Sequence, residues 1–286
     1  MDLVARLRAE ARETNERRLL VLAGSPDATR RRAADALDSA GTDLDRTTLL
    51  GQVDFLECER LAPRAARTLL GATRDAIVVD CHDECRPNAL GIATGAVDGG
   101  GLLVLLTPPL SAWPDRRDDF DESLAVPPFE RGQVIGYSRR RFAWTLRQHR
   151  GVAIVEVGPG GPDSDTVVDD GLVHPAPRRQ PRPPDPPEDA AFPAAAYEAA
   201  LTADQADAVA TLEALAEPGT AVVVEADRGR GKSSAAGLAA ASLALEGRDV
   251  LVTAPDYRNA AAVFERAETL LVDLGDLAGR DRDDHP

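Results

Sequence analysis

The sequence predicts an α/β protein, in which a parallel-sheet N-terminal domain is followed by the first part of a P-loop α/β domain. Three observations support this fold class. Short apolar runs alternate with helical patterns in the first half of the chain, a proline-rich segment follows residue 173, and a strand, a glycine-containing turn and a helix come next. Apolar, β-branched runs of this kind are typical of strands buried on both faces of a parallel sheet.

The elements of the first domain follow from these patterns. Strands are expected at residues 18–24, 76–81, 101–109 and 152–157. Crossover helices are expected at residues 28–41, where Gly41 would end the helix, and at residues 57–74. The N-terminal α/β domain is therefore predicted to span residues 1–173.

Residues 174–193 contain eight prolines among mostly polar neighbours. Proline cannot donate a hydrogen bond to a sheet, and such a segment buries little surface. We expect a linker here, with a disordered insertion inside one domain as the alternative. The strand, turn and helix beyond it favour a domain boundary.

The second domain is predicted to span residues 194–286. It begins with a helix at residues 201–217, with Thr202 as the N-cap, and continues with a strand at 221–226, a helix at 231–247, a strand at 249–255 and a helix at 259–275. Two strands are fewer than a complete P-loop domain needs. The chain is therefore expected to be truncated.

Composition supports a cytoplasmic protein without a membrane partner. The 286 residues are 43% hydrophobic, which is enough for a core in each of two domains. No stretch reaches the 18 apolar residues of a membrane span, and the charged N-terminus lacks the apolar region of a secretion signal. Cys58, Cys81 and Cys85 are too few for a disulfide framework.

The net charge of −15 is typical of a halophilic protein, because the chain is rich in Asp and Glu and has a single lysine, Lys232. A carboxylate-rich surface keeps a protein soluble where ordinary charges are screened within about 3 Å at 1 M salt. The negative charge therefore does not exclude a nucleic-acid partner. Lys232 stands where a compact ammonium would be needed and a planar guanidinium would fit badly.

Residues 226–233 read Ala-Asp-Arg-Gly-Arg-Gly-Lys-Ser, which follows the phosphate-binding pattern Gly-x-x-x-x-Gly-Lys-Ser/Thr except at Ala226. Gly229 and Gly231 would let backbone N–H groups turn toward phosphates, and the following helix would add its positive end. Lys232 would reach the β- and γ-phosphates, and the Ser233 hydroxyl would bind Mg²⁺ of Mg-ATP. An ordinary glycine-rich turn is the alternative.

Segments on both sides of this loop resemble helicase motifs. The segment LTADQADAV resembles the glutamine motif of superfamily 1 helicases, in which the Gln205 amide would match both hydrogen-bonding edges of adenine. The segment VLVTAP resembles a motif on the second core strand, which singles out Thr253 and Pro255. A surface glutamine and a plain strand end are the respective alternatives. Together the segments resemble the start of a RecD-like ATPase module.

The predicted cofactors of this module are ATP and Mg²⁺. The predicted nucleotide-binding residues are Gln205, Asp227, Arg228, Gly229, Arg230, Gly231, Lys232, Ser233 and Ser234.

Residues 77–109 are similar to the N-terminal domain of the tRNA(Met) cytidine acetyltransferase (TmcA-like) family. An Asp after a strand, a Pro-Asn-Ala-Leu-Gly segment, a glycine-rich turn and a leucine-rich strand that ends in Thr-Pro carry this resemblance. The matching residues are Asp80, Pro87, Asn88, Ala89, Leu90, Gly91, Gly95, Gly100, Gly101, Thr107 and Pro108. In this family the same N-terminal domain precedes a RecD-like helicase domain.

The resemblance implies ATP-driven N4-acetylation of a cytidine in tRNA, with acetyl-CoA as the donor. A GNAT acetyltransferase domain and a tRNA-binding domain follow in the family, so acetyl-CoA would bind in the missing C-terminal part. No acidic Walker B motif follows the P-loop in this sequence. We therefore expect no catalytic residues in this fragment, which alone would only bind nucleotide.

Two other functions compete with this interpretation. One is a RecD-like nucleic-acid-dependent ATPase or helicase without acetyltransferase activity. The other is a split or truncated gene product whose first domain serves only as an interaction module.

Residues 138–150 form the densest basic segment that also carries aromatic side chains. Phe142 and Trp144 lie among its arginines, and such a mixture can bind phosphates and stack bases. We favour an amphipathic helix that buries Phe142, Leu146 and His149, with RNA contact by its arginines as an additional possibility. The RNA contacts predicted here are Arg139, Arg140, Arg141 and Arg147.

Cys81, His82 and Cys85 could suggest a metal site or a reactive thiol. A zinc site needs four protein ligands, or three and a water molecule, and the sequence supplies no second cluster. Nothing in the sequence places a base beside either cysteine. We therefore expect neither a metal site nor a catalytic thiol at these residues.

Overall fold

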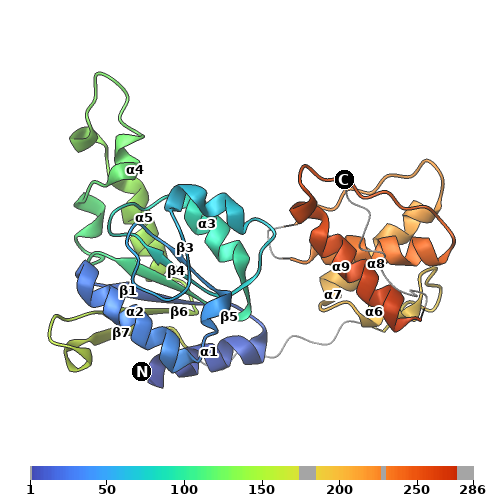
Figure 1. Ribbon diagram of the computed structural model, residues 1–286, viewed down its shortest axis with the longest axis horizontal. Coiled ribbons are helices and arrows are strands. Elements are labelled where there is room, and N and C mark those ends of the chain that lie inside the picture. Colours follow the sequence, from blue (N-terminus) through green and yellow to red (C-terminus); the bar gives the residue numbers. More distant parts are fainter. Residues whose placement is uncertain (1, 174–184, 227–229, 276–286) are drawn as a thin grey trace. The chain divides into compact units, whose positions relative to one another are not determined.

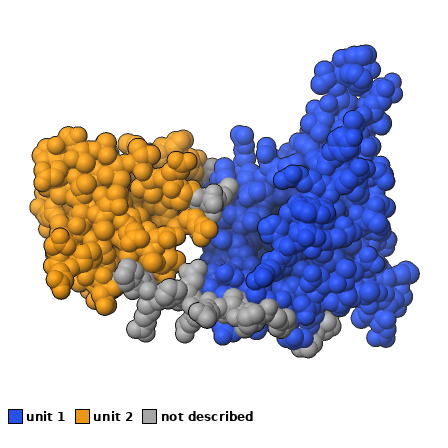
Figure 2. Space-filling model, turned by 180° about the vertical axis from the view of Figure 1, so that it is seen from behind, with its two compact units in different colours: residues 1–179 blue, residues 180–286 orange. Residues whose placement is uncertain are grey.

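The computed structural model describes residues 2–173, 185–226 and 230–275. The chain divides into two compact units, Met1–Arg179 and Gln180–Pro286, which Figure 2 colours separately. Each unit has hydrophobic clusters of its own. Within the described residues, no helix combines the length and the apolar character that crossing a membrane requires.

Unit 1 is built on a seven-stranded sheet with the strand order β3-β2-β4-β5-β1-β6-β7. All neighbouring strands are parallel except β6 and β7, which are antiparallel. The strands are β1 (Arg18–Ala23), β2 (Thr47–Leu50), β3 (Glu59–Leu61), β4 (Arg74–Asp80), β5 (Val97–Thr107), β6 (Val152–Glu156) and β7 (Thr166–Asp170). The predicted parallel sheet is thus confirmed.

Helices cover both faces of this sheet (Figure 1). Side chains alternate along β1, so that Leu20 and Leu22 pack with α1 and α2, while Val21 and Ala23 pack with η2, α3 and α5. Both faces of the sheet are therefore buried, which explains why the central strands consist of continuous apolar runs. The helices are α1 (Asp2–Thr14), α2 (Pro26–Ala40), the 3₁₀ helix η2 (Pro63–Leu69), α3 (Pro87–Ala96), α4 (Asp119–Glu122) and α5 (Tyr137–Leu146).

The four expected strands correspond to β1, β4, β5 and β6, and the first expected helix corresponds to α2. Gly41 ends α2 in the left-handed region, with φ 61°, as predicted. Three strands were not anticipated. β2 and β3 are short, and β7 is an exposed edge strand, so none of them has a long apolar run that the sequence would reveal.

The prediction of a crossover helix at residues 57–74 is wrong. This segment forms β3, which pairs with β2, and then the 3₁₀ helix η2. Pro63 explains the difference, because a proline lacks an N–H group and disfavours helical geometry in the residue before it. Ala62 is accordingly extended, with ψ 147°.

Unit 2 consists of helices packed around one hydrophobic cluster. They are α6 (Ala194–Glu198), α7 (Ala203–Leu212), a 3₁₀ turn (Glu213–Ala216), α8 (Lys232–Leu245) and α9 (Tyr257–Asp273). The three predicted helices correspond to α7, α8 and α9. Thr202 caps α7 as expected, because its side-chain oxygen accepts a hydrogen bond from the backbone N–H of Gln205.

In the described part of unit 2, the strands expected at residues 221–226 and 249–255 do not form. Val223 is 92% exposed and Leu251 is 87% exposed. Two strands alone make a marginal sheet, and parallel strands need cover on both faces. Of the expected linker, residues 174–184 lie outside the described residues, and residues 185–193 form neither helix nor strand.

Candidate nucleotide-binding site

The predicted phosphate-binding loop ends at a tight left-handed turn. Gly231 has φ 80° and ψ 19°, and α8 begins at the next residue, Lys232. A non-glycine residue is strained in this conformation. The first-turn N–H groups of α8 lack helical partners, so the turn and the helix start together can bind an anion. Of the predicted loop residues, Asp227, Arg228 and Gly229 lie outside the described residues.

Gln205 lies against this turn. It is 7% exposed, and a Cβ atom on residue 231 would overlap its side-chain amide. The Gln205 Oε1 atom accepts a hydrogen bond of 2.8 Å from the backbone N–H of Leu201, which fixes the orientation of the side chain. The structure therefore brings together two residues that lie 26 positions apart and that the sequence assigned to the same site.

The Lys232 side chain reaches back across the loop. Its Nζ atom donates a hydrogen bond to the backbone carbonyl of Ala226, the first position of the motif. The acceptor belongs to the main chain, so alanine can supply it as well as glycine. The departure from the motif at Ala226 therefore leaves this contact intact.

A cavity of about 380 Å³ opens beside the loop. Two cationic side chains, Arg230 and Lys232, and two acidic ones, Asp204 and Glu225, contribute to its wall. The full lining is Asp204, Gln205, Ala208, Val224, Glu225, Ala226, Arg230, Gly231, Lys232 and Ala235. An ammonium, a glycine turn and a helix start around one cavity fit the phosphates of a nucleotide.

The remaining predicted residues of unit 2 lie outside this lining. Ser233 and Ser234 are half-buried in the first turn of α8. Thr253 and Pro255 are exposed in the segment after residue 249.

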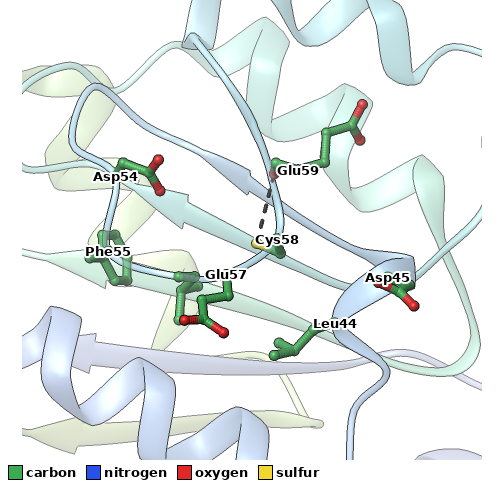
Figure 3. A pocket seen from close by; sticks show the side chains of 8 residues that line it. Leu44, Asp45, Asp54, Phe55, Glu57, Cys58 and Glu59 are labelled. Atoms are coloured by element: carbon green, nitrogen blue, oxygen red, sulfur yellow. Dashed lines mark hydrogen bonds between the residues drawn. The ribbon is translucent and has the colours of Figure 1, made fainter.

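A second cavity of about 670 Å³ lies in unit 1, beside the loop that leads into β3 (Figure 3). It is lined by Leu44, Asp45, Asp54, Phe55, Leu56, Glu57, Cys58 and Glu59. Figure 3 shows the carboxylates pointing in different directions. The Cys58 thiol donates to the Glu59 carbonyl at 3.7 Å, and burial, together with Asp54 and Glu59, raises the pKa of this thiol. A protonated thiol is a poor nucleophile, so the surroundings of Cys58 do not activate it as one.

Cys81, His82 and Cys85 are buried at the end of β4. A hydrogen bond with the Cys85 thiol and burial raise the pKa of Cys81 well above its ordinary value. The His82 Nε2 atom lies 2.8 Å from the Thr29 hydroxyl, and burial lowers the pKa of His82. Across the described ranges, no group of three or more His, Cys, Asp or Glu side chains is placed to hold a metal ion.

The predicted RNA-contact arginines lie on α5 and, for Arg147, at its C-cap, and they divide into two sets. Arg139 is 6% exposed and forms ion pairs with Asp118 at 2.8 Å and with Asp121 at 2.6 Å, so its proposed role in RNA contact is wrong. Arg140, Arg141 and Arg147 are exposed. The helix buries Leu146 and partly buries Phe142 as expected, but His149 lies beyond its end and is exposed.

Comparison with known proteins identifies the family. Residues 1–157 match the family model described as tRNA(Met) cytidine acetyltransferase TmcA, N-terminal. The chain belongs to the tRNA(Met) cytidine acetyltransferase TmcA family. Residues 223–285 match a second family model, described as RNA cytidine acetyltransferase NAT10/TcmA, helicase domain. The order of the two matches along the chain is the order expected for TmcA proteins.

Two relatives named tRNA(Met) cytidine acetyltransferase TmcA support this assignment. The protein from Haloarcula marismortui is 57% identical over 286 residues, which is 100% of this chain and 36% of the relative. The protein from Haloferax volcanii is 55% identical over 278 residues, which is 97% of this chain and 36% of the relative. The chain thus spans about a third of the length of these TmcA relatives.

Proposed function

We propose that this chain is the N-terminal portion of an ATP-dependent tRNA cytidine N4-acetyltransferase. Residues 1–173 are the N-terminal α/β domain, residues 174–193 a linker, and residues 194–286 the N-terminal part of the RecD-like ATPase domain. The observation that carries the proposal is the Gly231 turn with Lys232 at the start of α8, in a chain of the TmcA family. We assign acetyl-CoA to the part of the whole protein that this chain does not span.

ATP with Mg²⁺ would supply the free energy for rearranging RNA, since exposing a base costs a few kcal/mol of stacking. Lys232 would exchange its hydrogen bond with the Ala226 carbonyl for a charge-assisted one with phosphate oxygens. Backbone N–H groups at the start of α8 would bind phosphate, and Ser233 would hold Mg²⁺. Gln205 would contact the adenine, and Arg230 would add positive charge at the cavity.

The net charge of −15 supports a cytoplasm of high salt as the working environment. The proposed macromolecular substrate is tRNA, as the names of the relatives state for those proteins. A RecD-like helicase without acetyltransferase activity would have the same P-loop, but the family match at residues 1–157 favours the acetyltransferase.

The P-loop is tested by calorimetric titration of the purified chain with Mg-ATP. Lys232→Ala should abolish detectable binding, because it removes the sole lysine of the sequence from the cavity. The matched control is Arg248→Ala, which removes an exposed cation of the same unit that pairs with Glu246. Equal ATP affinity of wild type and Lys232→Ala would reject the nucleotide site.

The acetylation is tested with the whole protein, extended to the full length of its relatives. Mass spectrometry of nucleosides from tRNA incubated with acetyl-CoA and ATP should detect N4-acetylcytidine for wild type and strongly reduced amounts for Lys232→Ala. Binding of acetyl-CoA should stay near normal in the variant. Duplex unwinding without any N4-acetylcytidine would favour the helicase instead.

A further inference from the structure

The exposed face of α5 combines aromatic and arginine side chains. Tyr137, Arg140, Arg141, Trp144 and Arg147 recur at the spacing of one helix face, and all five are exposed. We call these five residues the α5 stripe. The opposite face carries Arg139, Ala143 and Leu146, which are buried in unit 1. The stripe therefore contributes little to the core that holds the helix in place.

Trp144 is exposed, in contrast to the other tryptophan of the chain. The sequence contains two tryptophans, of which Trp113 is 1% exposed and Trp144 is 60% exposed. Tyr137, one helical turn before Arg140 and Arg141, is 66% exposed. Exposed aromatic side chains are enriched at sites where a partner binds, since each ring offers a flat apolar face.

The charges of the stripe oppose those of the whole chain. Residues 138–150 contain five arginines and no acidic residue, whereas the chain carries a net charge of −15. Among the described residues, none of the three stripe arginines forms an ion pair with a carboxylate. The Arg140 guanidinium instead lies 5.7 Å from the centre of the Tyr137 ring. Three guanidinium groups therefore remain able to pair with an anion.

Short-range contacts are the ones that would survive in a high-salt environment. At about 1 M salt, charges separated by more than about 3 Å no longer attract one another appreciably. An RNA surface in such an environment cannot depend on a broad positive field. It needs rings that stack on bases and planar guanidinium groups that touch phosphates directly. The α5 stripe offers both kinds of group along one face.

The framework beneath the stripe holds it in a fixed position. Arg139 anchors α5 through its buried pairs with Asp118 and Asp121. At the start of the helix, Gly136 packs against the backbone of Pro114. The segment between α4 and α5 projects from the rest of unit 1 (Figure 1). It carries further exposed apolar side chains, Val126, Phe129 and Ile135.

We propose that the α5 stripe is an RNA-binding surface of unit 1, on which Trp144 and Tyr137 stack unpaired bases while Arg140, Arg141 and Arg147 contact the phosphates. The proposal rests on the proposed function only in taking tRNA as the RNA. It places an RNA contact in the N-terminal unit, on residues distinct from the nucleotide cavity of unit 2.

The test uses the purified chain, a labelled tRNA(Met) transcript and a short single-stranded RNA. Binding should quench tryptophan fluorescence, and the change reports on Trp144 because Trp113 is buried. Trp144→Ala should weaken binding at least about 5-fold, whereas Trp144→Phe should retain most of the affinity, since phenylalanine still stacks. Arg140→Gln with Arg141→Gln should reduce the slope of log Kd against log salt by about 1.4, the value for two phosphate contacts with a single strand.

The matched control is Arg31→Gln with Arg67→Gln, which removes the same charge from two exposed arginines elsewhere in unit 1 and should leave the salt slope unchanged. Lys232→Ala should bind RNA as wild type does, so a failed nucleotide site and a failed RNA surface give different results. Unchanged RNA affinity in both stripe variants would overturn the proposal. So would burial of Trp144 against another part of the whole protein, measured by loss of iodide quenching without RNA, since the face would then bind protein.

Discussion

The side-chain amide of Gln205 packs against the Cα atom of Gly231, so that the start of α7 and the start of α8 meet at the predicted phosphate-binding loop. Two features of the structure therefore require a glycine at residue 231. Its left-handed backbone disfavours any side chain, and the space where a Cβ atom would lie is filled by Gln205. The contact therefore joins the proposed nucleotide site to the packing of unit 2.

Gly231→Ala should destabilise unit 2 by about 1–3 kcal/mol, because it adds an overlap with Gln205 to the backbone strain. The matched control is Gly219→Ala, since Gly219 has φ 82° but no atom within 4 Å of its Cβ position. Urea unfolding of the two variants separates the overlap from the strain. The added substitution Gln205→Ala should restore part of the loss in Gly231→Ala. Equal unfolding free energies for the two glycine variants would contradict the packing role of Gln205.

The buried ion cluster beneath α5 predicts a dependence of stability on pH. Burial by itself would raise the pKa of Asp121, but hydrogen bonds from Arg139 and from the backbone of Asp118 outweigh it, and the pKa is lowered. A carboxylate whose pKa is lower in the folded state stabilises the fold above its unfolded pKa, and this contribution is lost as the pH falls further. Unfolding free energy should therefore decrease below about pH 4.

Arg139→Met should lower the unfolding free energy by about 3–5 kcal/mol at neutral pH, because Asp118 and Asp121 would be left buried without a cation. The unfolding free energy of Arg139→Met should depend less on pH between 4 and 3 than that of wild type. The control is Arg140→Met, one residue along the helix and exposed to solvent, which should change stability by less than about 0.5 kcal/mol. If the unfolding free energies of wild type and Arg139→Met depended on pH in the same way, the stabilising role of the ion pairs between Arg139 and the two aspartates would be contradicted.

The three thiols should react at different rates with a disulfide reagent. Cys58 is partly exposed, whereas Cys81 and Cys85 are buried. The raised pKa of Cys58 means that its reaction should be slow at neutral pH and accelerate as the pH rises. Cys58→Ala should remove the early reaction, and the other two thiols should react only on unfolding. Fast labelling of the Cys58→Ala variant would show that the thiols at the end of β4 are accessible.

Hydrogen exchange should distinguish the strands of the unit 1 sheet from the two segments of unit 2 that were expected to be strands but form none. Amides of the central strands β1, β4 and β5 should exchange slowly, because their N–H groups are bonded within a buried sheet. Amides of residues 221–226 and 249–254 should exchange fast in this chain, since they form no sheet. Slow exchange in these two segments would mean that the two strands pair with each other in solution.

The sequence by itself determined the elements whose signals are local. Continuous apolar runs identified β1, β4, β5 and β6, because strands covered on both faces leave no polar positions. Gly41 and Thr202 marked helix ends through backbone and capping chemistry that involves only near neighbours. The motif around Lys232 identified the candidate loop, because phosphate binding requires specific residues at fixed spacing.

Tertiary structure decided what depends on distant partners. Arg139, Arg140 and Arg141 are adjacent and identical, yet only Arg139 is buried, because Asp118 and Asp121 neutralise it from another segment. Residues 221–226 and 249–255 have the composition of strands, yet they stay unpaired, because a strand also needs a neighbour to bond with. Gln205 reaches Gly231 only because α7 and α8 pack around the same core. Local patterns set backbone preferences, but charge burial, strand pairing and side-chain contact are settled by residues far away in the sequence.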